Sequence, residues 1–138
     1  MKRNHQIRIG TSGWNYDHWR GTFYPEEISS SQWFDYYAGR FDTVEVNNSF
    51  YQLPKPETFD KWRDSAPEGF CFSAKASRYI TKIKKLKHPE EPVSNFMNSV
   101  DLLKEKLGPV LFQLPPKWKC NPGRLGAFLK ALPGNHAY

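Results

Sequence analysis

Cysteine is scarce in this chain of 138 residues: only Cys71 and Cys120 are present, and they form no CxxC pair. Two cysteines are too few for the disulfide framework that holds a small secreted domain together. Cys71 stands inside an apolar run, where a buried and unreactive thiol is the ordinary interpretation. The sequence therefore excludes the disulfide-rich classes and predicts no structural disulfide.

Long hydrophobic runs are absent too. No apolar run approaches the roughly 20 residues that a membrane-spanning helix needs, so we expect no membrane partner. The basic residues Lys2 and Arg3 are followed by no apolar segment of signal-peptide length. Nothing in the sequence argues for export, and a cytoplasmic location is the default prediction.

Familiar catalytic and metal-binding motifs are missing. The sequence has no GxGxxG, no P-loop and no GxSxG. The four histidines are scattered and form neither an HxH nor an HExxH set: His5, His18, His88 and His136. We therefore predict no metal site in this chain, and the cofactor stays unknown.

Acidic residues are missing from one segment, and this gap accounts for the net charge. The chain has 20 Lys and Arg against 14 Asp and Glu, a net charge of +6. Residues 69–89 carry six bases and no acid, so the rest of the chain is neutral: Lys75, Arg78, Lys82, Lys84, Lys85 and Lys87. The basic character is local, which argues against a protein that is basic over its whole surface.

Short strand-like segments alternate with helical patterns along the chain. Four β-branched or aromatic runs are predicted strands: 7–10, 43–47, 70–75 and 110–114. Apolar stripes with helical spacing follow them: 33–41, 56–66, 93–107 and 122–132. This alternation predicts a parallel sheet, in either an open doubly wound fold or a (β/α)8 barrel. A full barrel needs about 250 residues, so this chain suits half of one.

Capping residues mark two of the predicted helix boundaries. Ser29 and Gln32 have the spacing of a capping box before the first stripe, and Gly39 can end that helix. Asn121 precedes Pro122 and is the predicted N-cap of the last helix.

Four sequence blocks resemble a known family. They are GTSGWNY with the following WRG and FYP, TVEVNNSFY, FSAKASR and LFQLPP, which begin at residues 10, 43, 72 and 111. In this order they resemble the domain-of-unknown-function 72 family, also called YecE-like. One departure is Lys82, which follows Thr81 where many relatives are expected to have a histidine.

The resemblance implies a TIM barrel of roughly twice this length. Residues 1–138 are then the N-terminal half of a single barrel domain, comprising its first four β/α units, and the C-terminal half is absent. We expect either a truncated chain or a second half supplied by another chain. The resemblance gives the fold and implies no reaction.

Strand parity predicts which side chains point into such a barrel. Side chains alternate between the two faces of a strand. If Val44 and Val46 face the helices, Glu45 and Asn47 point inward. By the same rule Lys75 and Gln113 point inward near the C-terminal ends of the third and fourth strands. TIM-barrel active sites are built at this end of the barrel.

These residues define the leading hypothesis, an enzyme or binding protein for a small anionic or hydroxyl-rich molecule. Glu45 would serve as general acid or base and Lys75 as electrostatic anchor. Ligand binding is assigned to four further residues: Trp14 as an aromatic wall, Asn47 and Gln113 as orienting groups, and Arg78 on the rim. The structural alternative is an internal Glu45–Lys75 ion pair that does no chemistry.

Two rival hypotheses stay open. The basic segment 78–88 follows the third strand and could bind nucleic acid or a nucleotide phosphate, although a solvated lysine-rich loop is the commoner explanation. Alternatively, the chain is a fragment without activity, whose unpaired strand edges lead to self-association.

Overall fold

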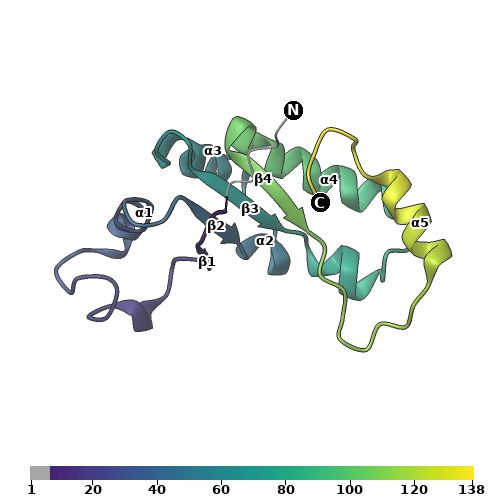
Figure 1. Ribbon diagram of the computed structural model, residues 1–138, viewed down its shortest axis with the longest axis horizontal. Coiled ribbons are helices and arrows are strands. Elements are labelled where there is room, and N and C mark those ends of the chain that lie inside the picture. The colour runs from purple at the N-terminus through teal and green to yellow at the C-terminus, as the bar shows by residue number, and fades with distance from the viewer. Residues whose placement is uncertain (1–6) are drawn as a thin grey trace.

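Four parallel strands form one sheet in the computed structural model, which describes residues 7–138 (Figure 1). The strands lie in sequential order, and each pairs in parallel with the next. They are β1 (Thr11–Ser12), β2 (Thr43–Val46), β3 (Cys71–Lys75) and β4 (Leu107–Leu111). The predicted α/β class with a parallel sheet is confirmed.

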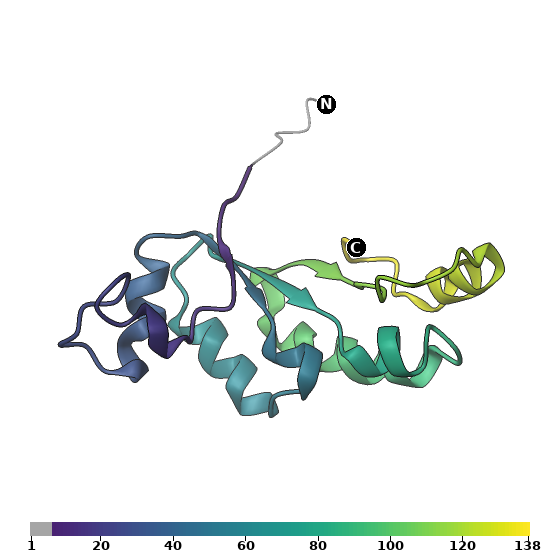
Figure 2. The same ribbon diagram turned by 90° about the horizontal axis from the view of Figure 1, so that it is seen from below.

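Helices separate the strands in the predicted alternation. The main ones are α1 (Trp33–Ala38), α3 (Pro56–Ser65), α4 (Glu90–Val100) and α5 (Pro122–Ala131), with a short α2 (Asn48–Tyr51) after β2. Figure 2 shows α1, α3 and α4 together on one side of the sheet. A doubly wound sheet reverses its strand order and carries helices on both faces. Sequential order with the crossover helices on one face is instead the arrangement of four consecutive β/α units of a half barrel.

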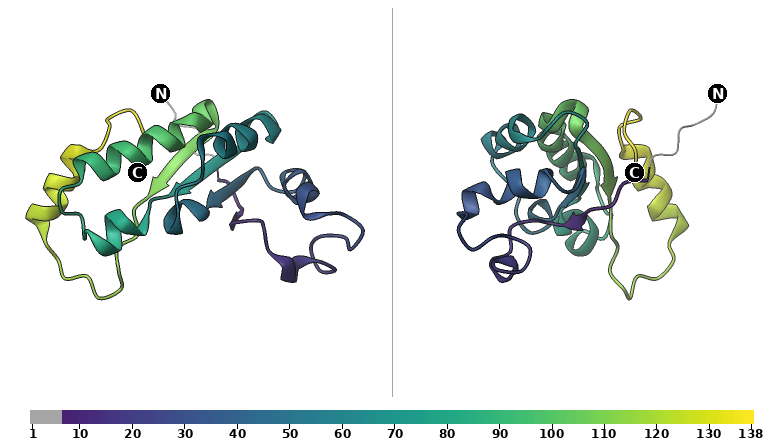
Figure 3. Two further views of the ribbon diagram at one scale, coloured as in Figure 1. Left: turned by 180° about the vertical axis from the view of Figure 1, so that it is seen from behind. Right: turned by 60° about the vertical axis from the view of Figure 1, so that its left-hand side comes forward.

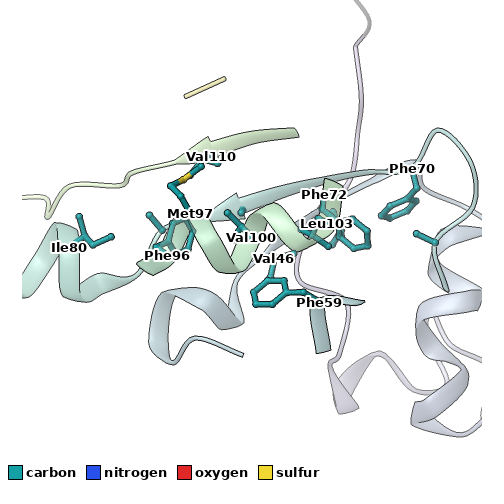
Figure 4. Packing of buried hydrophobic residues seen from close by; sticks show 14 of the residues in the cluster. Val46, Phe59, Phe70, Phe72, Ile80, Phe96, Met97, Val100, Leu103 and Val110 are labelled. Atoms are coloured by element: carbon teal, nitrogen blue, oxygen red, sulfur yellow. The ribbon is translucent and has the colours of Figure 1, made fainter. Parts of the chain in front are cut away.

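The hydrophobic core lies between the sheet and these helices. Alternate strand residues are buried against the helix layer, each at most 1% exposed: Val44, Val46, Phe72, Ala74 and Val110. Phe59 of α3 and Met97 and Val100 of α4 pack against them (Figure 4). The predicted parity is therefore correct on the helix side of the sheet.

The predicted caps form. The Ser29 side chain and the Gln32 side chain complete a capping box before α1, and Gly39 ends that helix. Asn121 Oδ1 accepts a hydrogen bond from the Arg124 amide at 3.0 Å, which starts α5.

Two strand boundaries and one helix boundary differ from the prediction. The first strand is Thr11–Ser12 and not 7–10, because pairing with β2 begins only where Thr11 lies opposite Val44. The last strand begins at Leu107 and ends at Leu111, so Gly108 and Pro109 belong to the sheet. The stripe at 93–107 accordingly divides into α4 and a 3₁₀ segment, η4 (Asp101–Lys106), which contains a residue with φ of 53°.

The C-terminal residues return to the sheet beside β4 (Figure 3). The Val110 amide donates to the Ala137 carbonyl oxygen at 2.9 Å. His136 Nε2 lies 2.6 Å from Asp101 Oδ1 at the end of α4. Both contacts hold residues 135–138 against the edge strand.

Candidate functional site

A pocket of about 330 Å³ opens where β1 and β2 end. We call it the strand-end pocket. Four aromatic side chains line it: Trp14, Tyr16, Tyr51 and Trp62. The polar residue Asn47, which directly follows β2, lines it too. This is the end of a parallel α/β sheet at which ligands bind.

A tight turn after β1 places Trp14 at the pocket. Gly13 has a φ of 79°, a conformation that favours glycine, and its amide donates to the Glu45 carbonyl oxygen at 2.9 Å. The Tyr24 hydroxyl donates to the Trp14 carbonyl oxygen at 2.5 Å. The indole itself packs 5.2 Å from the Trp62 ring, centroid to centroid. Backbone and ring are both held, so this wall is formed without a ligand.

Asn47 is the polar group that the pocket leaves unsatisfied. Its Oδ1 atom is buried and has no hydrogen-bond partner in the described part of the chain. A buried acceptor without a donor costs about 1–3 kcal/mol, so nearly all such atoms in proteins are bonded. A ligand with a hydroxyl or amine donor would relieve this cost.

Glu45 and Lys75 lie on the sheet face opposite the helices, but neither lines the strand-end pocket. Glu45 Oε1 accepts from Ser12 Oγ at 2.6 Å, across the β1–β2 pairing. The Lys75 backbone is fixed by the buried Ser49 hydroxyl, which donates to its carbonyl oxygen at 2.6 Å. Both side chains are half-buried, as expected for residues on a face that is only partly covered.

The remaining two candidates do not line the strand-end pocket. The Arg78 guanidinium carbon is 5.8 Å from the centre of the Tyr51 ring, which places Arg78 at the margin of the strand-end pocket. Gln113 is exposed, two residues beyond β4, and does not line this pocket. The structure thus brings Trp14 and Asn47 together, with Arg78 near them.

Three aromatic residues of the pocket were not among the predicted ligand contacts: Tyr16, Tyr51 and Trp62. Trp62 lies in the apolar stripe 56–66, and it packs against the hydrophobic core as well as lining the pocket. Tyr51 had no sequence signal beyond its position shortly after a predicted strand. Its place depends on α2, a single helical turn that the sequence did not predict.

The basic segment 78–88 is anchored rather than a free loop. It begins with a π-helical turn, η3 (Tyr79–Ile83), and three of its side chains are buried: Ile80, Thr81 and Leu86. Lys82, Lys85 and Lys87 are exposed. A hollow of about 530 Å³ beside the segment is lined by Lys84 and His88, but Glu90 and Glu91 line it too.

Metal and disulfide chemistry find no support among the described residues. Both cysteines are free thiols, with Cys71 half-buried and Cys120 exposed. No group of three or more His, Cys, Asp or Glu side chains within residues 7–138 could hold a metal ion. Over the same residues, no helix has the length and apolar character to cross a membrane.

Comparison with known sequences decides the family. The family described as "Protein of unknown function DUF72" matches residues 8–138. The chain belongs to the DUF72 family. It is 32% identical over 137 residues to the UPF0759 protein YecE of Escherichia coli K12, covering 96% of this chain and 46% of YecE. It is 34% identical over 120 residues to YunF of Bacillus subtilis 168, covering 83% of this chain and 42% of YunF.

Solved structures agree with the family. A DUF72 family protein from Thermotoga maritima is 30% identical, with a TM-score of 0.78 over 97% of this chain and 54% of that protein. One from Enterococcus faecalis is 25% identical, with a TM-score of 0.65 over 91% of this chain and 46% of that protein. The chain therefore spans about half the length of the relatives it matches.

Proposed function

We propose that the strand-end pocket binds a small hydroxyl-rich molecule. The observation that carries this proposal is the buried, unbonded Oδ1 of Asn47 among aromatic walls. A ligand hydroxyl can donate to that oxygen, while the faces of Trp14 and Tyr51 can cover the apolar face of a ring. Few polar groups within mostly apolar walls are typical of small-molecule sites.

The other predicted site residues take secondary roles in this proposal. Arg78, beside Tyr51, would donate hydrogen bonds to oxygen atoms of the ligand. Glu45, oriented by the Ser12 hydroxyl, and Lys75 are proposed as the acid–base residue and the electrostatic anchor of a reaction on the same sheet face. Gln113 would orient a part of the ligand that extends toward β4.

Isothermal titration calorimetry of this chain tests the binding proposal. The probes are glucose, ribose, myo-inositol and their monophosphates. We expect at least one of them to bind, and Asn47→Ala to weaken that binding at least tenfold. Asn98→Ala is the matched control, because Asn98 is exposed on α4 and away from the pocket.

Two results would contradict the proposal. One is binding that Asn47→Ala and Asn98→Ala weaken equally. The other is no binding of any probe up to 10 mM, which would instead support the hypothesis of a fragment without activity.

Nucleic-acid binding through residues 78–88 stays the rival prediction. The exposed Lys82, Lys85 and Lys87 support it, while Glu90 and Glu91 in the adjoining hollow weaken it. If it holds, neutralising the three lysines will flatten the slope of log affinity against log salt for an oligonucleotide.

We also propose that these 138 residues are the N-terminal half of one eight-stranded barrel. The sequential parallel order of the strands and the coverage of about half of each relative support this. An open half barrel leaves strand edges unpaired, so the isolated chain should self-associate. Light scattering measures this, and a compact monomer would count against it.

A further inference from the structure

A second hollow adjoins the strand-end pocket at its aromatic wall. Trp14, Asn15 and Trp62 also line this hollow of about 690 Å³, which we call the outer hollow. Its other lining residues come from α1, from α3 and from the segments just before these helices. Because the same side chains border both spaces, a ligand in the strand-end pocket can continue past Trp14 into the outer hollow.

A third hollow shares lining residues with both. It has a volume of about 480 Å³, shares Tyr51 with the strand-end pocket, and shares Lys55 and Thr58 with the outer hollow. The three spaces are thus neighbours that share lining residues near the start of α3. A volume of 330 Å³ is at the low end of the roughly 300–1,000 Å³ typical of ligand pockets, so the strand-end pocket alone suits one ring.

Hydroxyl and carboxyl groups dominate the polar lining of the outer hollow. Ser30, Ser31, Thr58 and Ser65 supply hydroxyls that can donate and accept hydrogen bonds. Carboxylates from the first turns of α1 and α3 supply strong acceptors for ligand hydroxyls: Asp35 and Glu57. The indoles of Trp14 and Trp62 add apolar surface to this lining.

The charges of the outer hollow argue against a polyanion. Two carboxylates are matched there by two ammonium groups, on Lys55 and Lys61. A site for nucleic acid needs a basic excess, which this lining does not have. A neutral chain of hydroxyl-bearing rings fits both the charge balance and the hydroxyl content.

We propose that the ligand is a neutral oligosaccharide, with one sugar ring in the strand-end pocket and the next in the outer hollow. This inference rests on the proposed binding of a hydroxyl-rich molecule by Asn47, and it specifies the ligand class. It gives Asp35 and Glu57 the role of binding the second ring.

Calorimetry with sugars of increasing length tests the inference on the whole chain. The probes are glucose, maltose and maltotriose, and in parallel cellobiose and cellotriose. In one of the two series we expect affinity to rise at least tenfold from the monosaccharide to the disaccharide. The double variant Asp35→Ala/Glu57→Ala should lose that rise and keep the affinity for glucose. Glu68→Ala/Glu105→Ala removes two equally exposed carboxylates elsewhere and should keep the rise.

The outcomes separate this inference from the proposal beneath it. If glucose binds in an Asn47-dependent way and longer sugars bind no better, the oligosaccharide inference fails and the binding proposal stands. If neither these sugars nor any probe of the binding proposal binds up to 10 mM, both fail. If the length dependence survives in Asp35→Ala/Glu57→Ala, the second ring lies elsewhere and the outer hollow is not its site.

Discussion

The two faces of the sheet differ in what they contribute to this molecule. The face toward the helices carries Val44, Val46 and Phe72, which are at most 1% exposed. The opposite face carries Glu45 and Ser73, which are half-buried and hydrogen-bonded to neighbouring strands. Residues that are adjacent in sequence therefore lie on opposite faces and have different roles. One face stabilises the fold by burying apolar side chains, and the other face, together with the strand ends, presents polar groups.

The contrast follows from the physics of a parallel sheet with its helices on one side. Apolar side chains are removed from water only where the helix layer covers them, at about 25 cal/mol per Å² of apolar area. Polar groups on the other face keep partial hydration or bond across strands. Functional groups can thus change on one face at little cost to stability.

The largest predicted effect compares two consecutive residues of β3. Phe72→Ala empties a fully buried site that packs against Phe34 and Phe70, and it should lower the free energy of unfolding by about 3–5 kcal/mol. Ser73→Ala removes only the bond from Ser73 Oγ to the Pro109 carbonyl oxygen, at a cost of about 1 kcal/mol. Urea denaturation measures both changes. Equal losses in the free energy of unfolding would show that both faces of the sheet contribute equally to stability.

Much of this contrast was predictable from sequence, because strand parity is a local property. The alternation of Val44, Glu45 and Val46 assigns their faces before any tertiary contact is known. Capping was local too: Ser29 with Gln32, and Asn121, mark helix starts that the structure confirms.

The strand-end pocket was predictable only in part, because its walls come from separate elements. Trp14 follows the first predicted strand by four residues and Asn47 ends the second, so the sequence predicted both at the same end of the sheet. Tyr51 and Trp62 reach that end through the packing of α2 and α3, which no local pattern encodes. Similarly, Gly108 and Pro109 resemble a helix stop, but pairing with β3 draws them into β4.

Tyr24 connects the helix side of the molecule to the site. Its ring stacks on Trp33 at 4.8 Å, and its hydroxyl donates to the Trp14 carbonyl oxygen. Tyr24→Phe should cost about 1 kcal/mol of stability, because the carbonyl loses its donor. The variant should also weaken ligand binding, since Trp14 is then less firmly held. If ligand binding is unchanged while stability falls, Tyr24 contributes to the core and does not position Trp14 for binding.

The same phenol predicts a loss of stability at high pH. Burial, with a smaller contribution from Tyr37, raises the pKa of Tyr24 above its ordinary value near 10. The unfolded chain then ionises first, so this stabilising contribution is complete below pH 10 and is lost as pH rises further. Between pH 10 and 11 the parent should therefore lose stability more steeply than Tyr24→Phe in urea denaturation.

Low pH should lower the stability of the helix layer by a smaller amount, through Asp64 of α3. A hydrogen bond from Arg63 Nε, 2.8 Å long, lowers the pKa of Asp64, and Arg63 Nη1 also donates to the Leu102 carbonyl oxygen. Because the folded pKa is lowered, this contribution is present above the unfolded value near 3.9 and is lost as pH falls through the folded value. Asp64→Asn should make the urea midpoint less dependent on pH between 5 and 2.5.

The smallest expected effect is the most specific for the site, and it compares two asparagines. Asn47 Oδ1 is buried without a donor, whereas Asn121 Oδ1 accepts from the Arg124 amide. Asn121→Ala should cost about 0.5–2 kcal/mol, as loss of an N-cap does. Asn47→Ala removes an acceptor that has no bond to lose, and relief of its desolvation cost should offset the packing lost with the side chain, so the free energy of unfolding should change by less than about 0.5 kcal/mol in either direction. Urea denaturation without ligand measures both. A loss at Asn47 as large as at Asn121 would mean that its amide supports the fold, and the reason to assign it to a ligand would disappear.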